Sequence, residues 1–344
     1  MLKVIDADAH VVETERTWEF MLPEDQRYRP AVLQPKPGYR TPAPEYWLID
    51  GRAFGKNANV GQDTPDAARE GEDIRLRLRH MDELGVAIHV LYPTIFLRPL
   101  TIHAEVETAL YRGYNRWVAH IAAQGEGRLR WVVLVPLMSL DRAIEEMHFG
   151  KEHGACGVFM RAIEGEQRLS DPYFFPLYEE ASRLNLPICI HSGIGNFDMF
   201  DLFNRDSGFA TFKMPAVAGF HDLILKGVPS RFPDLRWGFV EISSQWLPYA
   251  LNDLAIRFRR QGKPFPGKSV LQENRIYVAC QTTDDLRYVI DTVGDDNLVI
   301  GTDYGHNDTS SEIEALRRLQ ESAELDRSTA EKILSHNPAR LYGI

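Results

Sequence analysis

Short runs of apolar residues recur along the chain, separated by longer stretches in which apolar positions return every three or four residues. Most runs are nearly continuous in Val, Ile, Leu or Phe, as is typical of parallel strands covered on both faces. The stretches 140–153, 173–184 and 284–292 have the amphipathic pattern of helices, and Ser139 and Gly154 mark the ends of the first. The strand-like runs are 3–8, 87–92, 129–135, 157–161, 187–191, 236–241, 275–279 and 297–301.

Eight strands that alternate with helices predict an α/β fold, the (β/α)8 TIM barrel. A length of 344 residues is ordinary for this fold as one unit. The sequence contains neither an internal repeat nor a linker, so we expect residues 1–344 to form a single domain. Catalytic residues in such a barrel lie at the carboxyl ends of the strands.

Two long segments interrupt the alternation of strands and helices. Residues 12–71 are predicted to form an insertion after the first strand, with a hairpin at 46–52 that turns at Asp50-Gly51. A second long loop, 193–219, carries the apolar residues Phe197, Met199, Phe200, Phe203 and Phe209. Long loops on the active face of a barrel often act as lids or bind substrate. The same side chains could instead pack the loops onto the barrel, or pack two subunits together.

Composition restricts the partners and the location that we expect. The formal net charge of −10 argues against nucleic acid, because phosphate binding requires clustered Lys and Arg. The first residues enter a strand without the features of a signal peptide, and no apolar stretch approaches the length of a membrane span. The three cysteines have neither zinc-site nor disulfide-framework spacing. The expectation is a cytoplasmic protein that binds neither nucleic acid nor membranes.

Four of the strand-like runs end in a side chain that can bind a metal. Asp8 and His10 are two residues apart in the first strand, so their side chains project from the same face. His191 follows an apolar run directly, and Asp303 lies in a glycine-flanked segment at the end of the last strand. Alone, Asp8 could cap a loop and His10 could be a core histidine. Together, Asp8, His10, His191 and Asp303 are candidate ligands for Zn, Mn or Fe(II).

The sequence leaves open the roles of three further polar residues. Glu241 ends the sixth strand, where a carboxylate in apolar surroundings is costly unless it is paired or functional. It could be a ligand, an acid–base group or a partner that orients a ligating histidine. Asp303 could also act as a general base, and His306 could carry a proton or contact substrate. His221 is expected on a helix near the second long loop, as a proton donor or a packing residue.

Candidate substrate-binding residues come from the fourth strand and the two long loops. Arg161 ends the fourth strand and could clamp a substrate carboxylate, or form an ion pair with Glu241 or Asp8. Arg52 could bind an anion. Trp47 and Phe197 could contact a planar or apolar body.

Several segments together resemble the amidohydrolase-related family that includes aminocarboxymuconate-semialdehyde decarboxylase and the dihydroxybenzoate and resorcylate decarboxylases. The resemblance covers nearly the whole chain and is carried by residues 5–10, 171–178, 187–192, 231–236, 301–306 and 336–342. It implies a barrel with an insertion after the first strand, one divalent metal ion (Zn²⁺ or Mn²⁺), no organic cofactor and a homodimer. His10, His191 and Asp303 match ligand positions of the family.

Two positions depart from the usual pattern of this family. Asp8 stands where the first ligand is usually His, although some members have a carboxylate there. The change favours Mn or another metal that prefers oxygen ligands. Glu241 stands where the decarboxylases typically have a His that handles the water or proton of the reaction.

The resemblance implies a metal-dependent, non-oxidative decarboxylase of a small aromatic or unsaturated carboxylic acid. In this hypothesis Asp303 or His306 protonates the carbon that bears the carboxylate. A second hypothesis is a metal-dependent hydrolase of an amide, ester, lactone or C–C bond on the same scaffold, which Glu241 favours. A third is a barrel that binds a ligand without catalysis and need not retain a metal. The candidate catalytic residues are Asp303, His306, Glu241 and His221.

Overall fold

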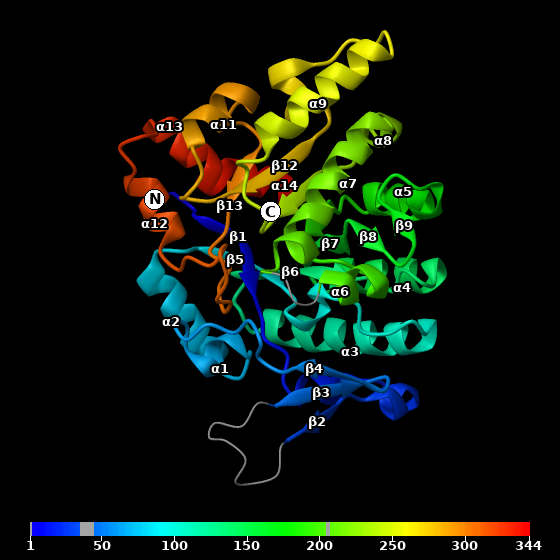
Figure 1. Ribbon diagram of the computed structural model, residues 1–344. Coiled ribbons are helices and arrows are strands. Elements are labelled where there is room, and N and C mark those ends of the chain that lie inside the picture. Colours follow the sequence, from blue (N-terminus) through cyan, green and yellow to red (C-terminus); the bar gives the residue numbers. More distant parts are fainter. Residues whose placement is uncertain (1, 35–44, 204–206) are drawn as a thin grey trace.

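A parallel β-barrel forms the centre of the molecule (Figure 1). Within the described residues, 2–34, 45–203 and 207–344, it has eight strands in the order β1-β5-β6-β7-β10-β11-β12-β13. A backbone bridge between Ala9 and Tyr304 brings the end of the sheet back to β1, so the barrel is nearly closed. The strands are β1 (Ile5–His10), β5 (Ile88–Tyr92), β6 (Leu129–Leu134), β7 (Ala155–Arg161), β10 (Ile188–His191), β11 (Trp237–Val240), β12 (Ile276–Cys280) and β13 (Leu298–Ile300).

The fold prediction is confirmed, and each predicted strand has a counterpart whose bounds differ by a few residues. Every residue of these strands except Arg130 is buried, which explains why their sequences are continuous in apolar residues and do not alternate. The largest shift is in the first strand, predicted at 3–8 and found at Ile5–His10.

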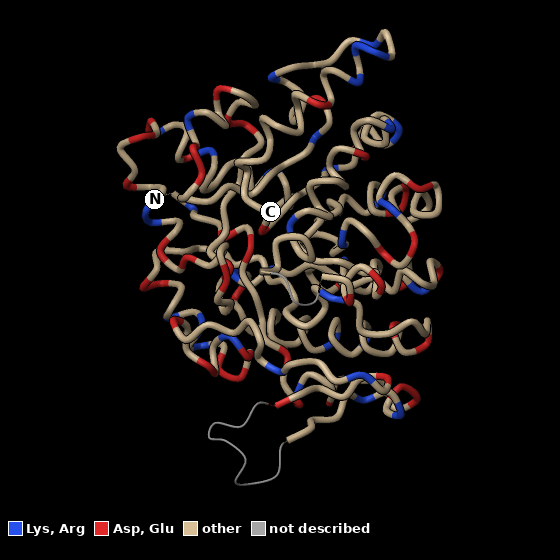
Figure 2. Tube along the Cα trace, in the orientation of Figure 1, with Lys and Arg blue, Asp and Glu red and all other residues tan. Residues whose placement is uncertain are grey.

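Helices cover the outside of the barrel (Figure 1). Along the described trace, Lys and Arg are interspersed with Asp and Glu (Figure 2). No described helix is both long and apolar enough to cross a membrane. The helices are α1 (Asp66–Arg69), α2 (Ile74–Leu84), α3 (Ala104–Ala123), α4 (Leu140–Glu152), α5 (Phe175–Arg183), α6 (Phe197–Phe203), α7 (Met214–Leu225), α8 (Val228–Arg231), α9 (Leu247–Arg260), α10 (Val270–Glu273), α11 (Leu286–Val293), α12 (Ala315–Glu321), α13 (Arg327–Glu331) and α14 (Asn337–Tyr342).

The insertion after β1 contains a small antiparallel sheet, at the lower end of Figure 1. Its strands are β2 (Ala31–Leu33), β3 (Tyr46–Ile49) and β4 (Arg52–Gly55). The predicted hairpin joins β3 to β4, and both turn residues, Asp50 and Gly51, have the positive φ of a type I′ turn. Strand β2 was not predicted from the sequence. Part of the predicted insertion, residues 35–44, lies outside the described residues.

The prediction of an irregular second loop was wrong for most of its length. Residues 193–219 contain α6, the short π-helix Phe209–Lys213 (η5) and the start of α7; residues 204–206 lie outside the described residues. Phe197, Phe200 and Phe203 recur every third position, a spacing that places them near one face of the helix.

Candidate metal centre

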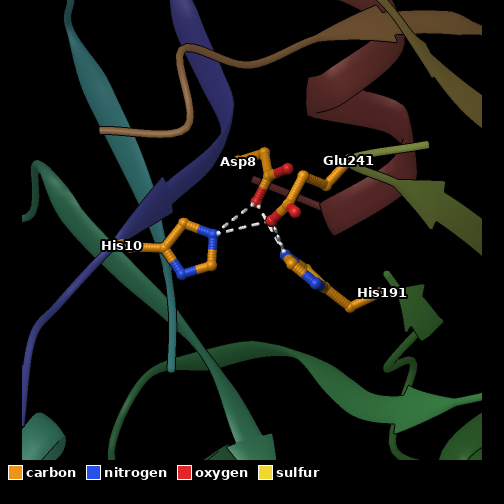
Figure 3. Close-up of side chains that lie close together, drawn as sticks. All are labelled: Asp8, His10, His191 and Glu241. Atoms are coloured by element: carbon orange, nitrogen blue, oxygen red, sulfur yellow. Dashed lines mark hydrogen bonds and ion pairs between the residues drawn. The ribbon is translucent and has the colours of Figure 1, made fainter. Parts of the chain in front are cut away.

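Four buried side chains from three strand ends converge at the carboxyl end of the barrel (Figure 3). Asp8 and His10 belong to β1, His191 ends β10, and Glu241 directly follows β11. Asp8 Oδ1 lies 3.5 Å from His10 Nε2 and 3.3 Å from His191 Nε2. Glu241 Oε2 lies 3.4 Å and 3.2 Å from the same two nitrogens. The predicted ligands of the first and fifth barrel strands are therefore brought together, and Glu241 joins them.

A second, overlapping group of ligand atoms shares His10 and Glu241 with the first. Asp303 Oδ1 lies 3.2 Å from His10 Nε2 and 2.8 Å from His306 Nδ1. In each group the ligand atoms all lie within 4.8 Å of one another. Together the residues Asp8, His10, His191, Glu241, Asp303 and His306 form what we call the carboxylate–imidazole cluster.

The backbone fixes the orientation of the two histidines that face the carboxylates. His10 Nδ1 lies 2.9 Å from the carbonyl oxygen of Pro93, and His191 Nδ1 lies 3.1 Å from that of Ser192. A carbonyl oxygen can only accept, so each Nδ1 carries a proton. The Nε2 of the neutral ring then presents a lone pair to carboxylate oxygens, which are also acceptors. A cation between the imidazole nitrogens and the carboxylate oxygens would accept the lone pairs of both, so that these atoms become its ligands.

Four atoms at the centre of the cluster are buried without a hydrogen-bond partner: His10 Nε2, Glu241 Oε2, Asp303 Oδ1 and His306 Nδ1. Buried polar atoms in native proteins nearly always have a hydrogen-bond partner. A group of such atoms that lacks partners and points to one place indicates a bound ion or water. Carboxylate oxygens and imidazole nitrogens suit a divalent cation. The buried cluster therefore fits a metal site.

The pKa shifts of Asp303, Glu241 and His10 are those expected for buried carboxylates whose negative charge is not neutralised. Burial raises the pKa of Asp303 well above its ordinary value, and burial with the nearby Asp303 charge raises the pKa of Glu241. Burial opposes protonation of His10, yet the nearby carboxylates of Asp8, Glu241 and Asp303 hold its pKa well above its usual value. Asp303 and Glu241 thus resist losing protons, and His10 resists losing its own, whereas the imidazoles of His191 and His10 hold the pKa of Asp8 below its ordinary value. Bound cations reverse both tendencies, because they favour deprotonated ligands.

Local backbone conformation places the ligands. Glu241 and Asp303 have φ values of 59° and 55°, in the left-handed region that non-glycine residues rarely adopt. Gly301 lets β13 approach β1, because a Cβ there would lie 2.4 Å from the Cβ of Asp8. A larger residue at this position would separate Asp8 from Asp303.

Sequence reasoning missed the residues that support the ligands. Asp6 accepts hydrogen bonds from Asp8 N at 3.2 Å and from Thr302 N at 3.0 Å, and so ties β1 to β13. The buried Arg77 donates to the carbonyl oxygen of His10 at 2.9 Å. Ser192 Oγ donates to Glu241 Oε1 at 2.7 Å. A signal for Asp6 was present, because residues 6, 8 and 10 alternate in the sequence, although the pairing of β1 with β5 shifts register between Asp6 and Ala9.

A cavity of about 990 Å³ reaches the cluster at Glu241, and it is also lined by Thr94, whose Oγ1 lies 2.9 Å from His306 Nε2. Three aromatic residues of the second long segment, Phe200, Phe203 and Phe209, line this cavity, as does Trp246. Its wall also contains two basic side chains, Arg98 and Lys213, that the sequence interpretation did not select.

The structure does not bring the two predicted arginines to this cavity. Arg161 is buried and pairs with Glu164, in place of the expected Glu241 or Asp8. Its remaining guanidinium donors bond the carbonyls of Phe96 and Arg98 and the Tyr111 hydroxyl, so none remains for a substrate carboxylate. Arg52 forms an ion pair with Asp201 at 2.8 Å. Protein groups thus already occupy both side chains, and their roles toward a substrate remain predictions.

Three other predicted residues also lie elsewhere. Trp47 is only 2% exposed and packs edge-to-face on Trp18 inside the insertion. Phe197 stacks beneath Arg52 and lines a separate cavity of about 450 Å³. His221 lies on α7, as expected for a helix, but pairs with Asp253 of α9 at 2.8 Å and does not contact the cluster. This position fits the packing alternative for His221, and its catalytic role remains a prediction.

Comparison with known proteins places the chain in a family. The sequence profile of the amidohydrolase family matches residues 5–344. The chain therefore belongs to the amidohydrolase family, and it is an enzyme of that family.

Individual relatives are distant but cover most of the chain. The 2-amino-3-carboxymuconate-6-semialdehyde decarboxylase of Dictyostelium discoideum is 18% identical over 79% of this chain and 76% of its own. An amidohydrolase from Mycobacterium avium subsp. paratuberculosis K-10 has a TM-score of 0.78 with 19% identity, covering 99% of each chain. The 5-carboxyvanillate decarboxylase of Novosphingobium aromaticivorans DSM 12444, in complex with manganese and 4-hydroxy-3-methoxy-5-nitrobenzoic acid, has a TM-score of 0.71 with 18% identity, covering 99% of this chain and 96% of its own.

Proposed function

We propose that this protein is a metal-dependent carboxy-lyase that releases CO₂ from a small aromatic carboxylic acid. The observation that carries the proposal is the buried carboxylate–imidazole cluster at one end of a cavity lined by aromatic rings. Two of the relatives named above are decarboxylases, and one of them was crystallised with manganese and a hydroxylated benzoic acid. These likenesses support the same reaction class here.

One divalent ion would be held by Asp8, His10, His191 and Glu241, together with Asp303. When bound, it supplies positive charge that draws the substrate's carboxylate and an adjacent hydroxyl into the site. Three carboxylates in the donor set favour Mn²⁺ over Zn²⁺. Compared with the sequence interpretation, Glu241 moves from an open role to that of a ligand.

The chain's own residues supply the proton. Thr94 Oγ1 donates to the carbonyl oxygen of Val11 at 2.8 Å, so it accepts a hydrogen bond from His306 Nε2 at 2.9 Å. His306 Nδ1 then faces Asp303 Oδ1, 2.8 Å away. This pair holds one shared proton, and it adjoins Thr94, which lines the cavity. Asp303 delivers the proton to the ring carbon that bears the carboxylate, the bond to the carboxylate breaks, and its electrons return to the ring as CO₂ leaves.

The aromatic wall favours this reaction over hydrolysis. Rings from Phe200, Phe209 and Trp246 surround the substrate with apolar surface and displace water. A carboxylate held in such surroundings loses its hydration, and loss of neutral CO₂ relieves that cost. Hydrolysis would instead require a water molecule beside the scissile bond.

A substrate panel tests the proposal. The protein reloaded with Mn²⁺ is incubated with 2,6-dihydroxybenzoate and 5-carboxyvanillate, and separately with the methyl ester of 4-hydroxybenzoate. We expect CO₂ and the corresponding phenol in equal amounts from at least one acid, and no cleavage of the ester. Ester cleavage without CO₂ from either acid would contradict the proposal and favour a hydrolase.

A further inference from the structure

Arg98 is held at the wall of the cavity by a rigid backbone. It directly follows the short 3₁₀ helix η3 (Ile95–Leu97) at the carboxyl end of β5. The buried Arg161 donates to the carbonyl oxygens of Arg98 at 2.7 Å and Phe96 at 3.2 Å. The carbonyl oxygen of the intervening Leu97 accepts from Ile194 N at 3.1 Å. Arg161 therefore positions the segment from which the side chain of Arg98 reaches the cavity.

The guanidinium of Arg98 has no partner among the described residues. Its Nε is buried without a hydrogen bond, and no described carboxylate forms an ion pair with it. Glu13 is the acid whose charge acts on it, but the two oxygens of Glu13 accept from Thr94 N and Ile95 N, each at 3.0 Å. Burial lowers the pKa of Arg98 because its charge is poorly solvated. An unpaired, desolvated guanidinium is costly unless an anion completes it.

Lys213 adds a second cation to the same cavity. Its Nζ donates to Ser310 Oγ at 3.0 Å, and it forms no ion pair with a carboxylate of the described residues. The acids that line the cavity among the described residues do not compensate these charges. Glu241 belongs to the metal centre, Asp284 accepts from Ser243 and Ser244, and Asp308 is exposed to solvent.

We propose that Arg98, assisted by Lys213, binds a second carboxylate of the substrate. The substrate is then an aromatic dicarboxylate, with one carboxylate at the metal centre and the other at Arg98, and its ring against Phe200 and Trp246. Arg98 presents a planar fork of donors that matches a carboxylate in a bidentate manner, whereas a hydroxyl or ester would leave its charge uncompensated. This inference rests on the proposed function, because it assigns the first carboxylate to the metal centre.

Binding of isophthalate (benzene-1,3-dicarboxylate) and of benzoate to the Mn²⁺-reloaded protein tests the inference by calorimetry. We expect the wild type to bind isophthalate at least about tenfold more tightly than benzoate, as for a charged hydrogen bond. Arg98→Gln removes this preference and leaves benzoate affinity within about twofold. Arg98→Lys retains part of it, and the surface variant Arg142→Gln retains all of it.

Equal preference for isophthalate in Arg98→Gln and the wild type would overturn the inference, as would a wild type that fails to bind isophthalate. Because Arg98 has no partner among the residues that the structure describes, we expect Arg98→Gln to keep the wild-type melting temperature. If Arg98→Gln does not fold, Lys213→Met takes its place in the test, and we expect this variant to reduce the preference for isophthalate. CO₂ release is measured on the same samples. If an aromatic acid releases CO₂ but Arg98→Gln does not change the preference for isophthalate, the proposed function stands and this inference fails. If the preference depends on Arg98 but no acid releases CO₂, the binding site stands and the proposed function fails.

Discussion

At the residue scale, the directions of side chains at the strand ends decide the chemistry. Spacing alone was enough to nominate Asp8, His10 and His191, because residues two apart share a strand face and parallel strands end at one rim. Spacing could not decide whether Glu241 is a ligand, an acid–base group or a partner that orients a histidine. Its side chain reaches the two Nε2 atoms through a backbone φ of 59°, and a hydrophobic pattern does not encode such a conformation.

Replacement of Glu241 by Gln tests its role as a ligand. Gln keeps the size and one oxygen of the side chain but removes the charge that faces His10 and His191. We expect metal affinity to fall at least about 100-fold, since even indirect partners of ligands commonly contribute 10- to 100-fold. Metal content after dialysis against graded chelator measures the change.

The surface variant Glu179→Gln serves as the control and should keep wild-type affinity. Unchanged metal affinity in Glu241→Gln would assign this glutamate to acid–base chemistry instead.

The arginines show where residue-level prediction stops. Arg161 was predicted to bind substrate because it ends a strand, yet it forms an ion pair with Glu164, three residues further on. Arg98 has no such partner in the described part of the chain, and only its tertiary surroundings reveal this. The partners of long charged side chains depend on tertiary neighbours that a single sequence does not specify.

At the scale of elements, the close approach of β13 to β1 is a condition for the metal centre. In Gly301→Ala the new Cβ would lie 2.4 Å from the Cβ of Asp8, so one strand must shift. We expect the free energy of unfolding to fall by about 1–3 kcal/mol, the usual range for overpacking, with loss of bound metal. Urea denaturation and metal analysis measure both.

The matched variant Gly55→Ala, on the small sheet, meets only the Cβ of Ala58 at 3.3 Å and should keep its metal. A Gly301→Ala protein with normal metal content would show that β13 need not lie so close to β1.

Helix α3 carries a buried acid that makes stability depend on pH. Burial raises the pKa of Glu107 to about 7 from an ordinary 4.5. The folded state therefore binds a proton that the unfolded state has lost, so this contribution is complete below pH 4.5 and disappears as the pH rises through 7. We expect Glu107→Gln to be more stable than the wild type at pH 8, by up to roughly 3 kcal/mol, and equally stable at pH 4.5. Urea denaturation at both pH values gives the difference, and a difference independent of pH would contradict this account.

The elements themselves were largely predictable, for a physical reason. Strands buried on both faces have unbroken apolar runs, and the hairpin has an Asp-Gly turn that requires positive φ at both positions. The helices of 193–219 were missed because α6 is short and exposed, so its period is weak in the sequence.

At the scale of the whole molecule, closure of the barrel assembles a site from opposite ends of the chain. Asp303 N donates to the carbonyl oxygen of Asp8 at 2.9 Å, which joins the last strand end to the first. The C-terminal helix α14 supports β1 from within the fold, since the Tyr342 hydroxyl donates to the carbonyl oxygen of Ala7 at 2.6 Å. Family membership and barrel fold are confirmed; the homodimer, the single domain and the cytoplasmic location remain predictions.

The central claim is that one divalent ion in the carboxylate–imidazole cluster makes the protein a decarboxylase. The most direct measurement is the titration of Mn²⁺ into metal-stripped protein while ¹³CO₂ is followed by NMR from carboxyl-labelled substrate. We expect no ¹³CO₂ without metal and a rate that rises linearly and saturates at about one ion per chain, the number that a single shared centre predicts. Release of ¹³CO₂ at the full rate from metal-free protein would contradict the account.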